Sequence, residues 1–403
     1  MRLATRAGDV HLTYCTNIHR GETWEETFAA LARSLPAIKA RASPDIATGV
    51  GLRLSAAAAE GLARPGELDR FRAWLREHDL YVFTLNGFPY GAFHGVRVKE
   101  RVYEPDWRSA ERLRYTARLA ELLAALLPEE SGLEGSLSTV PLGFRPLRRE
   151  PGALRATAAN LLEAVAGLVE LERRTGKRIA LALEPEPMCA LETTAEAVAF
   201  LEEYVLAREP LSELARKTGL SPGGAEAAAR RHLGVCFDVC HAAVEFEEPE
   251  ESADLLARAG IAVPKIQLSA ALRVPAVAPE TASVLRRFDD GIYLHQVVER
   301  TVDGRLRRYL DLPDALAAIG SALGAEWRVH CHVPIFTTDL APGLLSTRPS
   351  LERLLALQRE RPLARHLEVE TYTFEALPGE FRRESLEEAV ARELAWARAQ
   401  LLS

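Results

Sequence analysis

The segment IALALEPEP, residues 179–187, predicts both the fold and the place of the functional site. It begins as an apolar run typical of a buried strand and ends in Glu184 and Glu186, which share one face because residues alternate along a strand. Pro185 cannot donate to a sheet ladder, so the strand is ending there. A helical segment, TTAEAVAFLEEYVL at residues 193–206, follows. The segment is therefore one strand–helix unit with carboxylates at the strand's C-terminal end.

Strand–helix units recur along almost the whole chain. Their repetition implies right-handed crossovers and a parallel sheet, and about eight such units predict an α/β fold of the closed (β/α)8 TIM-barrel type. Nine segments read as strands, so one must lie outside the barrel; HLTYCTN (residues 11–17) and WRVHCHVPIF (residues 327–336) are the two that could be excluded. The other seven lie at residues 46–55, 80–89, 135–142, 179–187, 232–241, 263–272 and 366–373.

Two insertions are predicted within a single barrel domain that spans residues 1–403. Residues 206–231 read as a helical excursion with a Gly-Gly break, and a surface insertion is favoured there over a helix-turn-helix. Residues 273–312 contain a proline-rich loop and then alternating segments about Asp303 and Gly304, which predict a β-hairpin. We expect this hairpin to project over one end of the barrel.

The composition excludes several classes of protein. Hydrophobic residues make up 48% and charged residues 27% of the 403 residues, which is ordinary for a soluble globular protein. A net charge of −7 argues against a nucleic-acid partner. The five cysteines show no CxxC or zinc-finger spacing, which indicates reduced thiols and a cytoplasmic location. We find no signal-peptide pattern and no apolar stretch that predicts membrane insertion.

Polar residues follow two further predicted strands. In VCFDVCH, residues 235–241, Asp238 ends the strand and His241 comes three residues later. In HLEVETYT, residues 366–373, Glu368 and Glu370 share a face, and Glu370 is nearer the end. Carboxylates and a histidine delivered by separate strands to one end of a barrel predict a divalent metal site there. The competing interpretation is a surface ion pair for a glutamate and a helix N-cap for Asp238.

Other polar residues are candidates for the same barrel mouth. In HCH, His330 and His332 share one face, and His332 is nearer the mouth. Lys265 and Gln267 have one parity in the segment KIQLSAAL. Asn86 follows a third strand, and His19 follows the first. No P-loop, GxGxxG or GxSxG motif offers a competing chemistry.

At this level of detail the chain resembles a known superfamily. Glu at the end of LALEP, FDxxH, the polar strand VPKIQLS and the late Glu in LEVET resemble the xylose isomerase-like TIM barrels, which include sugar isomerases, epimerases and endonuclease IV-type enzymes. More closely, HLTYCTNIHRGETW, FTLNGFPYG, SLSTVPLGFR, HCHVPIF and HLEVETYTFEALP resemble the EboE-type metabolite traffic proteins of bacterial ebo gene clusters. This closer resemblance spans nearly the whole chain.

The resemblance implies a metal site and a type of chemistry. The superfamily's ligands, Glu, Asp, His and Glu, map onto Glu184, Asp238, Gln267 and Glu370, with Gln267 where histidine is usual. His332 from another strand could replace the missing histidine. A Mn²⁺, Mg²⁺ or Zn²⁺ ion would then bind a hydroxy-carbonyl substrate and stabilise an enediolate.

The residue roles that follow from the resemblance stay partly open. Glu184 and Glu370 would remove and return a proton, or Glu186 would be the base. His241, Asn86, His19, Lys265 and His330 are predicted substrate contacts.

Three functions remain open at this stage. The first is a metal-dependent isomerase or epimerase that acts in the synthesis or movement of a secondary-metabolite precursor. The second is a non-catalytic carrier or scaffold for a polyol, sugar-like or phenolic metabolite, which Gln267 favours. The third is an endonuclease IV-like phosphodiesterase, against which the acidic balance counts. Proteins encoded in the same gene cluster are the expected protein partners.

Overall fold

Eight parallel strands form a barrel in the computed structural model, which describes residues 1–94, 98–129, 132–374, 377–379, 382 and 384–403. Neighbouring strands pair in the order β3-β4-β5-β6-β7-β8-β15-β2, as a right-handed β/α repeat requires. The predicted (β/α)8 barrel is thereby confirmed. The barrel strands are β2 (Gly8–Tyr14), β3 (Thr48–Arg53), β4 (Leu80–Asn86), β5 (Gly135–Thr139), β6 (Ile179–Leu183), β7 (Leu233–Asp238), β8 (Lys265–Leu268) and β15 (His366–Val369).

Closure of the barrel between β2 and β3 depends on a side chain as well as on the backbone. A parallel bridge joins Cys15 to Gly51, and the Thr13 hydroxyl donates to Gly49 O (2.8 Å) while it accepts from Gly51 N (3.0 Å). An additional strand, β1 (Arg2–Thr5), pairs antiparallel with β2 outside the parallel series.

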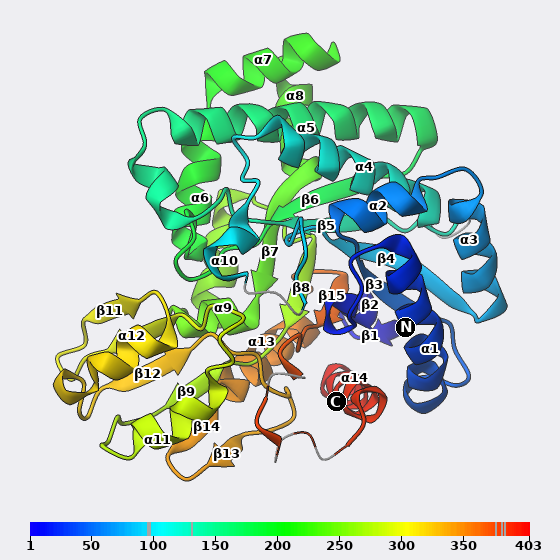
Figure 1. The fold of residues 1–403 in the computed structure, drawn as a ribbon. Helices are drawn as coiled ribbons and strands as arrows, with labels where there is room; N and C mark the ends of the chain where they lie inside the picture. Colours follow the sequence, from blue (N-terminus) through cyan, green and yellow to red (C-terminus); the bar gives the residue numbers. More distant parts are fainter. Residues whose placement is uncertain (95–97, 130–131, 375–376, 380–381, 383) are drawn as a thin grey trace.

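Helices surround the barrel, as Figure 1 shows. The first and last long helices both begin with a capping box, Thr23 with Glu26 in α1 and Ser385 with Glu388 in α14. The helices are α1 (Trp24–Ala42), α2 (Ala56–Leu62), α3 (Glu67–Glu77), α4 (Ala110–Leu126), α5 (Ala153–Thr175), α6 (Thr194–Phe200), α9 (Val239–Val244), α10 (Pro249–Ala259), α13 (Arg348–Glu360) and α14 (Leu386–Leu402). Shorter turns are η1 (Thr16–Ile18), η2 (Lys99–Tyr103), η3 (Arg145–Arg149), the π-helix η4 (Leu201–Val205), η5 (Arg286–Phe288) and η6 (Ile319–Ser321).

The predicted helical excursion consists of α7 (Arg208–Thr218) and α8 (Pro222–His232). Gly219 ends α7 with a φ of +69°, a left-handed conformation that glycine adopts without a steric penalty. Ser221 caps α8, which leads directly into β7. Among the helices of the described residues, none has the length and apolar character needed to cross a membrane.

A second sheet lies beside the barrel, drawn from yellow-green to orange in Figure 1. Its six antiparallel strands have the order β11-β10-β12-β9-β14-β13. The predicted hairpin is present as β10 and β11, but the inserted sheet continues past residue 312 as far as β14. The inserted elements are β9 (Leu272–Val274), α11 (Thr281–Leu285), β10 (Val297–Arg300), β11 (Leu306–Tyr309), α12 (Leu312–Ala317), β12 (Glu326–Val329), β13 (Asp339–Ala341) and β14 (Leu344–Ser346).

The strand to be excluded from the barrel is the one within WRVHCHVPIF. Its β12 pairs antiparallel with β9 and β10, whereas HLTYCTN contributes to the barrel strand β2. Every residue of β12 is buried, and this accounts for the barrel-like appearance of the segment in the sequence.

Candidate metal centre and cavity

Three carboxylates meet at the C-terminal end of the barrel. Glu184 follows β6, Asp238 ends β7 and Glu370 follows β15, and one oxygen from each lies within 4.8 Å of the others. All three side chains are buried. The parallel strands therefore place the predicted carboxylates in one cluster, at the end of the barrel where such folds hold their sites.

Local structure fixes the direction of two of these carboxylates. Asp238 is the N-cap of α9, and its Oδ1 accepts hydrogen bonds from His241 N and Ser269 Oγ, both at 2.9 Å. Glu370 Oε1 accepts from the amides of Asn17 (2.7 Å) and Asn86 (3.1 Å). Asp238 thus fills the N-cap role and the cluster position at once, because the cap occupies only one of its oxygens.

The cluster has the properties of a cation site. Glu184 Oε2 and Asp238 Oδ2 are buried and have no hydrogen-bond partner among the described residues. Burial, followed by the charge of Asp238, raises the pKa of Glu184 well above its usual value, and burial followed by Glu184 does the same for the pKa of Glu370. Unpaired buried carboxylates are destabilising unless a proton or a cation compensates them, and hard divalent cations prefer oxygen ligands. The residues present therefore fit a bound divalent ion.

Gln267, at the fourth predicted ligand position, lies beside Asp238 in the sheet. Its Oε1 accepts a hydrogen bond from the Cys236 thiol (3.1 Å), and its Nε2 has no partner within the described part of the chain. A half-turn of the amide would let Nε2 donate to the sulfur and free Oε1 for an ion. In the present orientation Gln267 offers no free oxygen to the cluster.

Three histidines form a second cluster next to the carboxylates. His241 lies in α9, whereas His330 and His332 follow β12 of the inserted sheet. His330 Nε2 lies 3.1 Å from His241 Nε2 and 3.3 Å from His332 Nε2. Asp238, His241 and His332 also bring one ligand atom each within 4.8 Å of one another. The structure thus places His332 with two other histidines and beside Asp238.

Glu186 has different surroundings from Glu184. Its Oε1 accepts hydrogen bonds from Tyr103 Oη (2.9 Å) and Gln296 Nε2 (3.1 Å). Burial raises the pKa of Glu186 to about 8, although these two hydrogen bonds oppose the shift. A carboxyl group with a pKa near neutrality can both accept and donate a proton under ordinary conditions.

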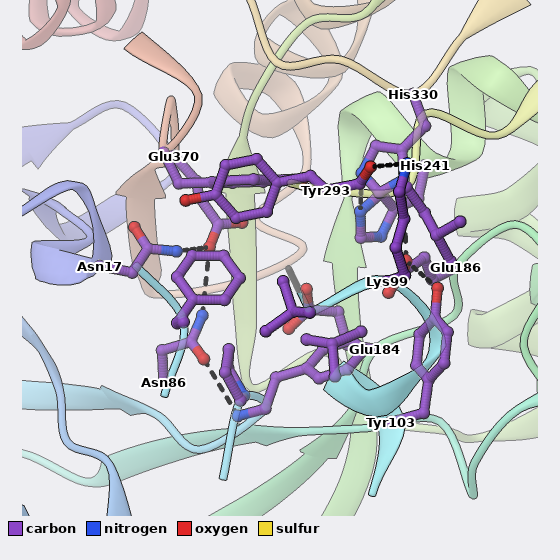
Figure 2. Close-up of a pocket in the computed structure, with 17 residues that line it drawn as sticks. Asn17, Asn86, Lys99, Tyr103, Glu184, Glu186, His241, Tyr293, His330 and Glu370 are labelled. Atoms are coloured by element: carbon purple, nitrogen blue, oxygen red, sulfur yellow. Dashed lines mark hydrogen bonds and ion pairs between the residues drawn. The ribbon is translucent and has the colours of Figure 1, made fainter. Parts of the chain in front are cut away.

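A pocket opens beside both clusters, and Figure 2 shows the residues that line it. Glu184, Glu186, Glu370, His241 and His330 line one part of it, and Asn17 and Asn86 hold Glu370 there. The remaining lining is mostly aromatic and aliphatic: Phe88, Pro89, Phe93, Val98, Val102, Tyr103, Tyr293, Leu294 and Tyr372, together with Lys99. The cavity therefore combines an oxygen-rich end with apolar walls.

Two predicted substrate contacts do not line this cavity. Lys265 begins β8, deep in the barrel, where its Nζ forms a fully buried ion pair with Glu368 at 2.6 Å. His19 is buried, and its Nε2 lies 2.8 Å from the Tyr14 hydroxyl. Both residues have partners inside the protein, and their role as substrate contacts stays a prediction. Asn86, His241 and His330 do line the cavity.

Three other residues at or beside the cavity carried no recognisable signal in the sequence. Tyr103 comes from the turn η2, and Gln296 reaches Glu186 from the residue before β10. Lys99, also in η2, bonds Tyr293 O (2.8 Å) and forms an ion pair with Asp311 (2.5 Å). These residues are not at the ends of barrel strands, so alternation along strands could not identify them.

Comparisons with known proteins give likenesses to solved structures. No family model and no curated protein matches the chain. A xylose isomerase domain protein from Planctomyces limnophilus matches with a TM-score of 0.47 and 14% identity over 87% of this chain and 88% of its own.

Two further solved structures are similar over most of their length. The IolI protein with a bound zinc atom matches with a TM-score of 0.44 and 13% identity over 96% of each chain. The probable 3-DHS dehydratase AsbF from Bacillus anthracis matches with a TM-score of 0.43 and 10% identity over 95% of this chain and 97% of its own.

Proposed function

We propose that this protein is a metal-dependent enzyme of the sugar isomerase or epimerase type, which acts on a small hydroxy-carbonyl metabolite. The observation that carries the proposal is the cluster of Glu184, Asp238 and Glu370 within 4.8 Å, with Glu184 and Glu370 lining a cavity. The resemblance of the strand-end motifs supports a finer role, in the synthesis or movement of a secondary-metabolite precursor.

The carboxylate cluster would hold the ion. Glu184, Asp238 and Glu370 supply oxygen ligands of the kind that Mg²⁺ and Mn²⁺ prefer and that Zn²⁺ accepts. A divalent ion bound there would supply positive charge to the oxygens of a substrate during proton transfer from carbon. Asn17 and Asn86 orient Glu370 through their amide donors.

Glu186 is the residue best suited to move the proton. It lines the cavity, and it stands outside the three-carboxylate cluster, so ion binding does not occupy it. In its ionised form it would take the proton from the carbon beside the substrate carbonyl, as the C–H electron pair moves toward the carbonyl oxygen. The proton of the hydroxyl group on that first carbon would pass to the former carbonyl oxygen, and Glu186 would return its own proton to the former carbonyl carbon, which completes the isomerisation. Tyr103 and Gln296 keep the carboxyl group in place.

The walls of the cavity indicate the class of substrate. Phe88, Phe93, Tyr293 and Tyr372 provide flat apolar surfaces beside the oxygen ligands. A ring-shaped polyol, a sugar-like compound or a phenolic compound has hydroxyl groups for the ion and an apolar face for these side chains. This is the substrate class that we propose.

Exchange of hydrogen with solvent tests the proposed reaction. The Mn²⁺-loaded protein is incubated in D₂O with a panel of ketoses, aldoses and cyclic hydroxy-ketones, and loss of the proton beside the carbonyl is followed by NMR. We expect exchange in the wild type and a reduction of about 100-fold or more in Glu186→Gln with its metal content unchanged.

Glu247→Gln is the matched control for this experiment, because the pKa of Glu247 is also raised, to about 7, but the residue does not line the cavity. It should keep the wild-type exchange rate. Absence of exchange with every compound, or equal rates in the wild type and Glu186→Gln, would refute the proposed reaction.

A non-catalytic carrier is the second candidate. The observation that favours it is Gln267, whose oxygen is engaged by Cys236 instead of facing the cluster as a ligand. A carrier would bind a cyclic polyol or a phenol stoichiometrically in calorimetry, with no hydrogen exchange at carbon. Binding that disappears in Tyr372→Ala, together with no exchange, would establish the carrier in place of the enzyme.

A further inference from the structure

Asn17 and Asn86 hold Glu370 in the same way, but their amide oxygens have different surroundings. Each residue donates from Nδ2 to Glu370 Oε1, at 2.7 Å for Asn17 and 3.1 Å for Asn86. The Asn86 oxygen accepts a hydrogen bond from Phe88 N at 3.0 Å. The Asn17 oxygen is buried and has no partner among the described residues. One of the two asparagines thus keeps an acceptor open.

The orientation of the Asn17 amide is fixed by its neighbours. Glu370 Oε1 already accepts from Asn86, whose own orientation is set by Phe88 N, so this oxygen acts as an acceptor. The group of Asn17 that faces it must then be the NH₂ group, and the Asn17 oxygen lies on the other side of the amide (Figure 2). A rotation that exchanged the two ends of the amide would remove a donor from Glu370.

The backbone around Asn17 is held on both sides. Asn17 is the central residue of η1, in which His19 N donates to Thr16 O at 3.0 Å. Asn17 O lies 2.7 Å from His94 Nε2, and only 2% of the residue is exposed. The open acceptor therefore belongs to a fixed turn and cannot find a partner through a small movement of the chain.

A buried acceptor without a donor is destabilising, so its presence points to a partner that comes from outside the protein. Asn17 lines the cavity together with Glu184 and Glu370. Its oxygen lies on the side of the amide away from Glu370, which leaves the proposed ion to the carboxylates. The partner that fits this position is a hydrogen-bond donor on a molecule bound in the cavity.

We propose that Asn17 is a specificity-determining residue, which accepts a hydrogen bond from a hydroxyl group of the substrate beside the oxygens bound to the ion. The substrate then carries three neighbouring oxygen functions, two for the ion and one for Asn17. This favours a cyclic polyol or a sugar-like compound over a compound with only two such oxygens. The inference rests on the proposed function, because it takes the carboxylate cluster as the place of the ion and the substrate.

Binding of two matched polyols tests this inference without any reaction. The full-length, Mn²⁺-loaded protein is titrated by calorimetry with cyclohexane-1,2,3-triol and with cyclohexane-1,2-diol, each stereoisomer separately. We expect the best triol to bind about tenfold more tightly than the best diol, since one hydrogen bond to a buried acceptor contributes about this factor. The comparison in the wild type does not depend on any variant folding.

Asn17→Ala and Asn86→Ala form a matched pair of variants. Each removes one amide donor from Glu370, but only Asn17→Ala also removes the open acceptor, because the Asn86 oxygen is used by Phe88 N. Asn86→Ala should weaken the binding of both probes by equal factors and keep the preference for the triol. Asn17→Ala should bind the triol and the diol with equal affinity. Circular dichroism and the manganese content show whether each variant is folded and loaded.

The outcomes separate this inference from the proposed reaction. Equal affinity for the triol and the diol in the wild type, as expected if only water meets the Asn17 oxygen, overturns the role of Asn17. A preference for the triol that survives in Asn17→Ala also overturns it. Hydrogen exchange that depends on Glu186, without a preference for the triol, leaves the reaction standing. A preference that is lost in Asn17→Ala, without exchange in any compound, supports the role of Asn17 and refutes the reaction.

Discussion

Two glutamates of one strand segment, Glu368 and Glu370, have opposite roles. Glu368 lies within the barrel against Lys265, and both side chains are fully buried. Glu370 opens onto the cavity. Alternation along the strand places both on one face, and only the distance from the strand end separates them. The sequence indicates that Glu370 is nearer the strand end, but it does not reveal that Lys265 pairs with the deeper Glu368.

The buried ion pair gives a prediction at the residue scale. Lys265→Met leaves Glu368 as an uncompensated buried charge, and we expect the free energy of unfolding to fall by about 3–5 kcal/mol. Lys265→Met combined with Glu368→Gln should recover most of this loss, because no charge remains. Urea unfolding measures both. A loss below about 1 kcal/mol in the single variant would show that the pair is not a structural requirement.

Gly51 gives a second prediction at this scale. A Cβ at this position would lie 2.0 Å from Glu368 Oε1 and 2.6 Å from Tyr14 O, too close for either to remain in place. We expect Gly51→Ala to destabilise the protein by about 1–3 kcal/mol. Gly167→Ala, in the middle of α5 with no atom within 4 Å of the added carbon, is the control and should be neutral or stabilising. Equal thermal stability of the two variants would contradict this account of barrel closure.

At the scale of elements, the C-terminal helix α14 supports the segments that carry the site. Glu393 of α14 accepts hydrogen bonds from Ile335 N (3.1 Å) and Thr371 Oγ1 (2.7 Å). These partners follow His332 and Glu370, respectively, in the chain. The spacing of apolar residues in the sequence predicts helix α14. It does not predict that one buried glutamate of this helix, Glu393, links two loops at the site.

This contact makes stability depend on pH. Burial raises the pKa of Glu393 from 4.5 to about 7, although the two hydrogen bonds oppose the shift. The folded state then holds a proton that the unfolded chain releases, so this contribution is complete below about pH 4.5 and is lost as the pH rises through about 7.

The measurement compares denaturant unfolding at pH 5 and pH 8. We expect the wild type to lose as much as about 3 kcal/mol more than Glu393→Gln between these values, because the amide mimics the protonated acid at both. Parallel pH dependence in the two proteins would show that Glu393 does not titrate in this range.

The sequence left open whether β12 or the strand within HLTYCTN lies outside the barrel. The buried, apolar pattern of β12 is the same as that of a barrel strand, and only pairing with β9 and β10 distinguishes it. Antiparallel pairing depends on distant segments, which local periodicity does not record. The position of β12 matters for function, since the segment after it carries His330 and His332.

At the scale of the whole molecule, the barrel and the inserted sheet meet at the site. The barrel supplies the carboxylates and His241, and the inserted segment supplies Gln296, His330 and His332. The barrel topology followed from repeated strand–helix units in the sequence. Apart from its hairpin, the second sheet could not be predicted from the sequence, because its strands are short and are joined by irregular loops.

Metal removal gives the prediction at this scale. Ions that bind only the folded state stabilise it by about 2.7 kcal/mol at a free concentration of 100 times Kd. We expect a chelator to lower the melting temperature of the wild type, and Mn²⁺ or Zn²⁺ to restore it. Glu184→Gln should not respond to either treatment. A wild type that does not respond to the chelator would contradict metal binding at the carboxylate cluster.

The central claim is that Glu184, Asp238 and Glu370 bind a divalent cation. Anomalous X-ray diffraction from crystals grown with Mn²⁺ tests it most directly, because the signal locates the ion itself. The account predicts an anomalous peak in contact with one oxygen from each of the three carboxylates. The absence of an anomalous peak in contact with these oxygens, in crystals grown at saturating Mn²⁺, would contradict it.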